Sequence, residues 1–252
     1  MYLKKESVIN KKAWEHRAYE FWVQQCGLPH ERAEIIMENP KLRLRKHGKY
    51  FENIEGKKIA NICGSNGRRA VALGLLDADV TVFDISVENK RYALELAECC
   101  HIKMDYILGD IYDMDTNLYE NHFDMLYLEG GILHLFHDIH KFMAILHKIL
   151  KPDGQIVLND FHPFRKVMPI NFFKSSVEDY FDTSIHEGDV AYKDFLETDE
   201  NEEIPNCSYR YYTISEILNS MINSGFLIKE FNEEPSWTND NLPGEFTIFA
   251  SK

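Results

Sequence analysis

The stretch 57–86 constrains the fold of this chain more than any other part of its sequence. An apolar strand pattern is followed by the small-residue turn 64–67, a helical pattern, and a β-branched strand pattern that ends on Asp84. In such a half of a parallel nucleotide-binding unit, the turn presents backbone N–H groups at a helix start, and the carboxylate after the second strand can accept hydrogen bonds from ribose hydroxyls. We therefore expect a ligand above Cys63 and Asp84. The expected elements are a strand over 59–63, a helix over 68–76 and a strand over 80–83.

The turn lacks the glycine pattern of a dinucleotide site. G-x-G-x-x-G lets the backbone close on a pyrophosphate, but counting from Gly64 the next two glycine positions hold Asn66 and Arg69. No G-x-x-x-x-G-K-[ST] run is present to hold a triphosphate. An adenosine ligand without phosphates fits the turn better, and an NAD-dependent oxidoreductase is the alternative.

Four motifs in this order resemble the class I S-adenosylmethionine (SAM) methyltransferases. A strand pattern over 104–108 precedes Gly109-Asp110-Ile111, which resembles the adenine-binding turn of that family. The segment 123–131 resembles its fourth strand, and the run ILKPDG at 149–154 resembles the turn before its fifth strand. The run TISEILNSMINSGF, then EEP and a P-x-x-F-x-I strand, is similar to the end of ubiquinone/menaquinone-biosynthesis-type methyltransferases, which belong to the small-molecule branch.

The resemblance implies an α/β fold with a doubly wound, Rossmann-like, seven-stranded mixed sheet of order 3-2-1-4-5-7-6. Five parallel strands joined by crossovers also follow from the alternation of strand and helix patterns. We expect residues 1–52 to form an N-terminal helical lid and residues 53–252 the SAM-dependent methyltransferase domain, with an inserted cap at 165–208.

Aromatic residues at helical spacing predict one amphipathic helix over 4–26. This helix docks on the core, covers the cofactor and substrate, or does both. Residues 165–208 mix aromatic and acidic residues without a regular pattern, and a loop of this length in a compact domain usually works as a lid or binding loop. A short helix is expected around 117–120.

The resemblance implies SAM as the cofactor and S-adenosylhomocysteine (SAH) as the product. Asp84 is expected to accept from the ribose hydroxyls, and Asp110 with the Ile111 backbone to bind adenine. The turn and Glu129-Gly130 are expected around the methionine end. The full implied cofactor site is Asn61, Cys63, Gly64, Ser65, Asn66, Gly67, Asp84, Ile85, Ser86, Gly109, Asp110, Ile111, Glu129 and Gly130.

The turn departs from the family motif, which has the form acidic-x-G-x-G-x-G. Alignment puts Asn61 at the acidic position and Cys63 and Ser65 at the first two glycines, so that among the glycines only Gly67 matches. We expect the neighbouring Gly64 and Asn66, which tolerate positive φ, to supply the backbone angles that keep the turn.

Two histidines follow strand ends, at the edge where open parallel sheets bind ligands. His134 comes just after the fourth strand, and His162 follows the fifth, beside Pro163, which fixes the backbone. Each is a candidate base for an attacking hydroxyl or amine, and a hydrogen-bonded structural histidine is the alternative. We favour His134, because its strand ends nearest the methionine end. The other residues expected around the acceptor are Trp14, Tyr19, Trp22, Tyr211 and Tyr212.

Neither of two possible metal sites is favoured. His134, His137 and His140 sweep through about 300° of a helix and cannot converge on one ion. Glu129, Asn159 and Asp160 could imitate the Mg²⁺ ligands of catechol-type oxygen methyltransferases, but the motifs resemble the metal-free small-molecule branch. We expect no metal.

The net charge narrows the class of methyl acceptor, and the hydropathy indicates whether the chain associates with a membrane. The formal net charge of −13 comes without a basic stripe and opposes binding to nucleic acid, which favours a small molecule. No apolar run approaches the roughly 18 residues of a membrane span, and the chain starts without a signal-peptide pattern, so we expect no membrane association and a cytoplasmic protein with reduced thiols. The sequence leaves the oligomeric state open. A third hypothesis for the function is a SAM-binding regulator without catalytic activity.

Overall fold

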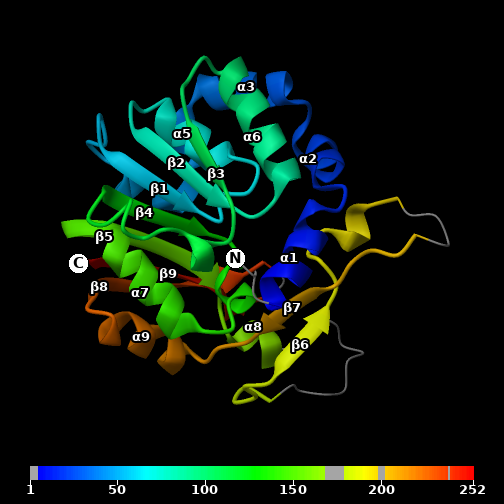
Figure 1. The fold of residues 1–252 in the computed structure, drawn as a ribbon, viewed down its shortest axis with the longest axis vertical. Helices are drawn as coiled ribbons and strands as arrows, with labels where there is room; N and C mark the ends of the chain where they lie inside the picture. Colours follow the sequence, from blue (N-terminus) through cyan, green and yellow to red (C-terminus); the bar gives the residue numbers. More distant parts are fainter. Residues whose placement is uncertain (1–4, 168–178, 198–201, 238) are drawn as a thin grey trace. The chain divides into compact units, whose positions relative to one another are not determined.

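The computed structural model describes residues 5–167, 179–197, 202–237 and 239–252. Its main sheet has seven strands in the order β3-β2-β1-β4-β5-β9-β8, and β6 and β7 form a separate two-stranded sheet (Figure 1). The predicted order 3-2-1-4-5-7-6 is confirmed, because the two strands of the small sheet do not enter the main one.

The elements follow the sequence patterns closely. The strands are β1 Lys58–Ile62, β2 Asp79–Asp84, β3 Asp105–Leu108, β4 Phe123–Glu129, β5 Leu150–Phe161, β6 Ile185–Gly188, β7 Cys207–Arg210, β8 Leu227–Ser236 and β9 Asn239–Ser251. The α-helices are α1 Lys5–Glu15, α2 Ala18–Cys26, α3 Pro29–Glu38, α4 Pro40–Arg43, α5 Arg68–Gly74, α6 Val87–Cys99, α7 Ile139–Ile149, α8 Phe164–Val167 and α9 Ile214–Asn223. Short 3₁₀ helices are η1 Arg45–Tyr50, η2 Ile111–Asp113, η3 Leu133–Leu135 and η4 Lys193–Phe195.

The chain divides into two compact units, which we describe separately. The first comprises residues 1–115 and 187–208, and the second residues 116–186 and 209–252. In the first unit, β1 pairs in parallel with β2 and β2 with β3. The buried run Ile59–Ile62 is continuously apolar apart from Asn61, as expected for a strand covered on both faces. Helix α6 contacts α2, α3 and α5 (Figure 1).

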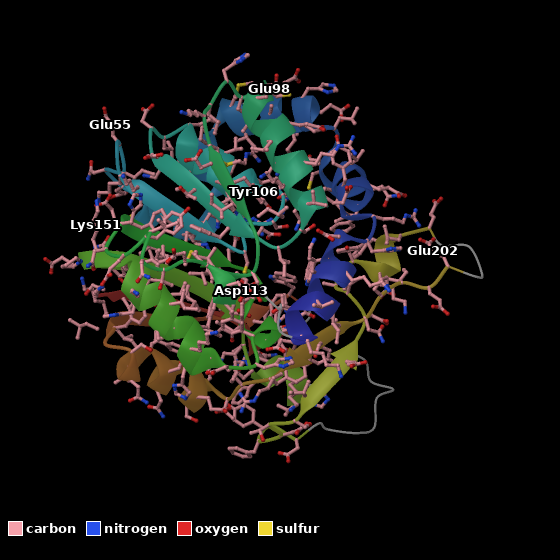
Figure 2. All side chains as sticks on the ribbon, in the orientation of Figure 1. Glu55, Glu98, Tyr106, Asp113, Lys151 and Glu202 are labelled. Atoms are coloured by element: carbon pink, nitrogen blue, oxygen red, sulfur yellow. The ribbon has the colours of Figure 1, made fainter. Side chains whose placement is uncertain are left out.

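The N-terminal segment forms two helices, and the prediction of one helix over 4–26 is wrong. Helices α1 and α2 are separated at Arg17, whose backbone is left-handed with a φ of 50°. The Arg17 guanidinium donates to the carboxylate of Glu20 at 2.7 Å and to that of Glu202 at 2.8 Å (Figure 2). These two charge-assisted hydrogen bonds explain how the chain holds a backbone angle that a continuing helix does not allow.

The predicted short helix around 117–120 is also wrong. Residues 116–121 form turns, and the short helix of this region is η2, which begins directly after Asp110. The Asp110 side chain accepts a hydrogen bond from the Tyr112 N–H, and this local bond starts the 3₁₀ turn.

Part of the predicted cap packs on the N-terminal helices within the first unit. The Tyr192 hydroxyl donates to the carbonyl oxygens of Ala13 at 2.8 Å and His16 at 2.9 Å, and its ring stacks on Phe21. Asn10 and Ser208 exchange side-chain to backbone hydrogen bonds of 2.9 and 2.7 Å. Residues 187–197 and 202–208 therefore share a packed interface with α1 and α2, while the division into lid, cap and domain stays a prediction.

The second unit is built on β4, β5, β9 and β8. Strand β4 pairs in parallel with β5, and β9 runs antiparallel to both β5 and β8, as expected for the last two strands. Helix α9 begins with a capping box, since Thr213 Oγ1 accepts from the Glu216 N–H and the Glu216 carboxylate accepts from the Thr213 N–H. Helices α7 and α9 pack together beside this part of the sheet (Figure 1).

We predict that Gly67→Ala lowers the free energy of unfolding by about 2–4 kcal/mol. Gly67 has a φ of 73°, and an added Cβ would lie 2.6 Å from the Cβ of Ala93 on α6. Urea unfolding measures the loss. Gly109→Ala is the matched control, because nothing lies within 4 Å of its added Cβ. Equal stability of the two variants would contradict this packing.

Candidate cofactor and acceptor site

The loop after β1 follows an alternating left-handed path. Cys63, Ser65 and Gly67 have φ values of 50°, 51° and 73°. These are the three glycine positions of the family motif, so the prediction that Gly64 and Asn66 supply the positive φ angles is wrong. Gly64 is required for space instead, since an added Cβ would lie 2.5 Å from Asn61 Oδ1.

Hydrogen bonds from β2 and β3 hold this strained loop. A left-handed backbone costs roughly 1–2 kcal/mol at a residue with a Cβ, and such strain persists where the surroundings fix it. The Ser65 N–H donates to Asp84 Oδ2 at 2.9 Å. The Ser65 carbonyl accepts from the hydroxyl of Tyr106 on β3 at 2.8 Å (Figure 2). Both polar groups of the Ser65 peptide are therefore fixed by the neighbouring strands.

Asp84 is a buried carboxylate at the end of β2. Its Oδ1 accepts from the Ser86 N–H at 2.9 Å and from Asn89 Nδ2 at 3.3 Å. Burial raises the pKa of Asp84, and its hydrogen bonds to Ser86, Ser65 and Asn89 oppose that rise. Oδ2 accepts from the Ser65 N–H at 2.9 Å, and the Ile85 N–H also contacts the carboxylate. Because each carboxylate oxygen has two lone pairs, Asp84 Oδ2 can accept from a ligand hydroxyl besides Ser65.

The N-terminal helices contact residues around Asp84. The Trp22 indole N–H donates to Asn89 Oδ1 at 2.7 Å, and the Asn89 amide in turn donates to Asp84. The Ser86 hydroxyl donates to the carbonyl oxygen of Trp14 at 2.7 Å. Trp14 and Trp22 were predicted at the acceptor, but in the first unit they contact the residues that orient the expected ribose carboxylate.

The turn after β3 lies beside Asp84 in the first unit. The Gly109 N–H donates to the Asp84 carbonyl oxygen at 2.9 Å. Asp110 is buried; its Oδ1 accepts from the Tyr112 N–H at 2.9 Å, and its Oδ2 accepts from the hydroxyl of Ser7 on α1. The contact between Ser7 and Asp110 joins α1 to the expected adenine-binding turn, and no motif pointed to Ser7.

Several buried polar atoms of the first unit have no hydrogen-bond partner among the described residues. Two of them belong to the contacts described above: Ser65 Oγ, in the loop after β1, and Trp14 Nε1, on α1. Arg32 Nε on α3 and Arg43 Nε on α4 are others. An unsatisfied buried donor or acceptor costs about 1–3 kcal/mol. Together with Asp84 Oδ2, Ser65 Oγ and Trp14 Nε1 fit a ligand that carries hydroxyl, amino and carboxylate groups, as SAM does.

In the second unit, Asp160 fixes the loop that follows β4. Its Oδ2 accepts from the N–H groups of Ile132 and Leu133, both at 2.8 Å, and its Oδ1 accepts from the Phe161 N–H at 2.6 Å. Burial raises the pKa of Asp160 to about 6, against the effect of these hydrogen bonds. From the sequence, Asp160 was considered only as a possible metal ligand. An acidic residue near the end of a buried strand is the signal that could have indicated its role in fixing the loop.

Glu129, Gly130 and Gly131 form the turn between β4 and that loop. The Gly130 N–H donates to the Asn159 carbonyl oxygen at 3.1 Å, and both glycines have positive φ angles, of 89° and 70°. An added Cβ at Gly131 would lie 2.4 Å from the ring of Phe161. The Phe161 ring therefore packs directly on this turn.

His134 lies on η3, directly after Ile132 and Leu133, whose N–H groups are bonded to Asp160. Its ring meets that of Tyr209 edge-on, with centroids 6.2 Å apart. Neither ring nitrogen has a hydrogen-bond partner within the described ranges. Burial, with a smaller effect of Arg165, lowers the pKa of His134 to about 4. At neutral pH the imidazole is therefore uncharged and able to accept a proton.

His162 has one hydrogen bond and one close carboxylate. Its Nδ1 accepts from the Phe164 N–H at 3.2 Å, and its Nε2 lies 2.9 Å from Glu233 Oε1 without the geometry of a hydrogen bond. Burial lowers the pKa of His162, although Glu233 acts in the opposite direction. This arrangement favours a structural role for His162 over the role of a base.

The remaining residues predicted around the acceptor belong to both units. Tyr19, in the first unit, donates its hydroxyl to Glu95 on α6. In the second unit the buried Tyr212 donates to the Phe136 carbonyl oxygen at 2.5 Å, whereas the Tyr211 ring packs against that of Tyr209 with centroids 5.2 Å apart. A single pocket formed by all of them stays a prediction.

The described part of the chain contains no group of three His, Cys, Asp or Glu residues arranged to hold a metal ion. The side chain of Asn159, considered as a metal ligand, donates to the Phe246 carbonyl oxygen at 3.0 Å. In the same part of the chain, no helix is both long and apolar enough to cross a membrane.

Comparisons with known proteins agree with this geometry. A family profile described as a methyltransferase domain matches residues 62–158. No curated protein sequence matches the chain. Among solved structures, a protein from Listeria monocytogenes described as a SAM-dependent methyltransferase superposes with a TM-score of 0.65 at 14% identity, over 83% of this chain and 97% of the other.

Two further structures have the same fold. A SAM-dependent methyltransferase from Mesorhizobium loti gives a TM-score of 0.62 at 18% identity, over 82% of this chain and 97% of the other. The magnesium protoporphyrin IX methyltransferase from Synechocystis, solved with bound SAH, gives 0.61 at 11% identity, over 98% of this chain and all (100%) of the other.

We predict that Ser65→Gly raises the free energy of unfolding by about 0.5–1.5 kcal/mol. Glycine removes the left-handed strain and the unpaired hydroxyl, and these gains exceed its entropic cost. The control is Ser224→Gly, at a φ of −83° with a hydrogen-bonded hydroxyl, which should lose about 0.5–1 kcal/mol. Chemical denaturation of both variants tests the difference, and a loss at Ser65 as large as that at Ser224 would argue against strain in the loop.

We also predict a pH-dependent stability difference between the wild type and His134→Gln. The pKa of His134 falls from 6.5 to about 4 on folding, so the unfolded chain binds more protons between these values. The stability from neutral His134 is complete above pH 6.5 and is lost as the pH falls toward 4. The wild type should therefore lose about 3 kcal/mol relative to the variant between pH 7 and pH 4.

The raised pKa of Asp160 has the opposite effect, between its ordinary value of 3.8 and about 6, and it acts in both proteins. The difference between their unfolding curves therefore isolates His134. Parallel curves from pH 7 to pH 4 would show that His134 is not desolvated in the folded protein.

The strand order and the matching domain profile agree with each other. Residues 62–158 match a methyltransferase-domain profile, and the chain has the fold of solved SAM-dependent methyltransferases.

Proposed function

We propose that this protein transfers the methyl group of SAM to a small-molecule acceptor by direct displacement. The observation that carries the proposal is the loop 61–67, which keeps positive φ at the motif positions 63, 65 and 67 although two of them are not glycine. A strained backbone that is retained beside a buried carboxylate indicates a binding function, because the fold alone gains nothing from it.

The residues of the first unit would bind the adenosine part of the cofactor. Asp84 Oδ2 has a lone pair for a ribose hydroxyl, and Asp110 with the Ile111 backbone would bind adenine. Asn61 to Gly67 would surround the methionine end, with Ser65 Oγ as a polar contact. Glu129 and Gly130, in the second unit, are assigned to the methionine end from the family resemblance.

SAM supplies an electrophilic methyl group on a sulfonium, and SAH is the leaving group. The protein has to align the acceptor atom with that methyl group and exclude water, and such positioning can supply on the order of 7–11 kcal/mol in the best cases. The proton on an attacking oxygen or nitrogen becomes more acidic as the new bond forms. A neutral His134 with a free ring nitrogen can accept it.

Several features support a small acceptor. The net charge of −13 opposes binding to nucleic acid. One structural neighbour is named for its action on magnesium protoporphyrin IX, which is a small molecule. The ubiquinone/menaquinone-type sub-branch and a cytoplasmic location remain predictions from the sequence.

Calorimetric titration tests the proposal. Wild-type protein should bind SAM and SAH, and Asp84→Ala should weaken binding of SAM by about 2–4 kcal/mol, on the scale of charge-assisted hydrogen bonds. Asp79→Ala is the matched control, because it removes an exposed carboxylate from the start of the same strand.

Tight binding of NAD without binding of SAM would favour the oxidoreductase alternative. Unchanged SAM affinity in Asp84→Ala would remove Asp84 from the site. Intact SAM binding with no methyl transfer to any compound in a metabolite screen would favour the regulator.

A further inference from the structure

We infer that the methyl acceptor carries an anionic group, of the carboxylate or phosphate type, which is held by the guanidinium of Arg165. The inference rests on the proposed methyl transfer and names the chemical class of its acceptor. All of the residues in the argument belong to the second unit.

Arg165 is a cation of this region that forms no ion pair or hydrogen bond with a carboxylate among the described residues. It lies on α8, which follows β5 and His162, and its guanidinium carbon is 3.9 Å from the ring centroid of Phe161 and 5.8 Å from that of Trp237. Within the described ranges the guanidinium forms no hydrogen bond or ion pair. A half-buried guanidinium that no carboxylate contacts directly is costly, and the aromatic rings and the more distant carboxylates of Glu245 and Asp160 offset only part of that cost.

The neighbouring cations differ from Arg165, because each has a carboxylate partner. Lys166 Nζ lies 3.6 Å from Asp182 Oδ2, and Arg210 donates to Glu216 at 2.6 Å. Glu245 and Asp160 are close enough to favour the charge of Arg165, but neither forms an ion pair with it in the described part of the chain. Asp160 is instead held by the N–H groups of the loop after β4.

A chain of contacts connects Arg165 to His134. The Phe161 ring under the guanidinium packs on Gly131. Gly131 directly precedes Ile132 and Leu133, whose N–H groups are bonded to Asp160, and His134 follows them. The His134 ring also contacts the ring of Tyr209, and the Tyr209 ring contacts that of Tyr211. Lys166 Nζ lies 4.9 Å from the centroid of the Tyr211 ring. An acceptor with an anionic end on Arg165 would therefore have aromatic side chains beside its body and the free imidazole within the same cluster.

The charge of Arg165 also affects how readily His134 accepts a proton. The positive charge of Arg165 contributes to the lowered pKa of His134. An anion bound to the guanidinium would cancel that contribution, so the imidazole would become a better base when the acceptor is in place. The planar fork of arginine donors also suits bidentate binding of a carboxylate or phosphate, which sets the orientation of the attached nucleophile.

Binding of matched probes to the SAH complex tests the inference. Benzoate, benzamide and phenyl phosphate are titrated into SAH-saturated protein and followed by NMR or calorimetry. We expect at least one of the two anions to bind about tenfold or more tightly than benzamide, and the better anion identifies the class. Arg165→Gln should abolish this preference, and Arg165→Lys should retain part of it.

Lys229→Gln is the matched control, since Lys229 is an exposed cation of the same unit that also lies over a phenylalanine ring, that of Phe249. The control should keep the preference for the anion. SAH affinity, measured on every variant, confirms that the protein is folded. Wild-type protein that binds neither anion more tightly than benzamide, or a preference that survives Arg165→Gln, overturns the inference. Failure to bind SAH and SAM would instead contradict the proposed function itself.

Discussion

The hydrogen bond from the Ser65 N–H to the Asp84 carboxylate is the interaction on which the candidate site depends. It holds the loop after β1 in a backbone path that its own residues disfavour, and it fixes the carboxylate at the end of β2. Asn89 supports Asp84, and Trp22 supports Asn89, so the N-terminal helices contribute to the same network. Loss of the carboxylate would therefore free the loop and remove the expected ribose contact together.

In the second unit, too, a buried aspartate fixes a neighbouring loop by accepting hydrogen bonds from its backbone. Asp160 is the last residue but one of β5, Asp84 is the last residue of β2, and each is a buried carboxylate that accepts hydrogen bonds from backbone N–H groups of an adjacent loop. Burial raises the pKa of both groups. In one unit this arrangement shapes the loop assigned to the cofactor, and in the other it places His134. In both units, hydrogen bonds from main-chain amides to a carboxylate near a strand end thus position the candidate residues.

The sequence predicted the strands of the main sheet, because apolar runs and turn residues are local signals, and their order came from the family resemblance. It did not predict β6 and β7, which lie in a segment without a regular pattern. It did not predict which residues of the loop adopt positive φ, because Cys63 and Ser65 tolerate that conformation only with support from Tyr106 and Asp84. The break at Arg17 was missed for the same reason, since Glu202, far along the chain, holds that guanidinium.

The role of Ser7 at Asp110 could not be predicted, because that contact joins residues with no shared motif. The most direct test of the central claim is a crystal structure with SAH bound. The account predicts a ribose hydroxyl within hydrogen-bond distance of Asp84 Oδ2, with Ser65 still left-handed and its N–H still bonded to that carboxylate. A ribose bound elsewhere, with the Asp84 carboxylate turned away from the ligand, would contradict it.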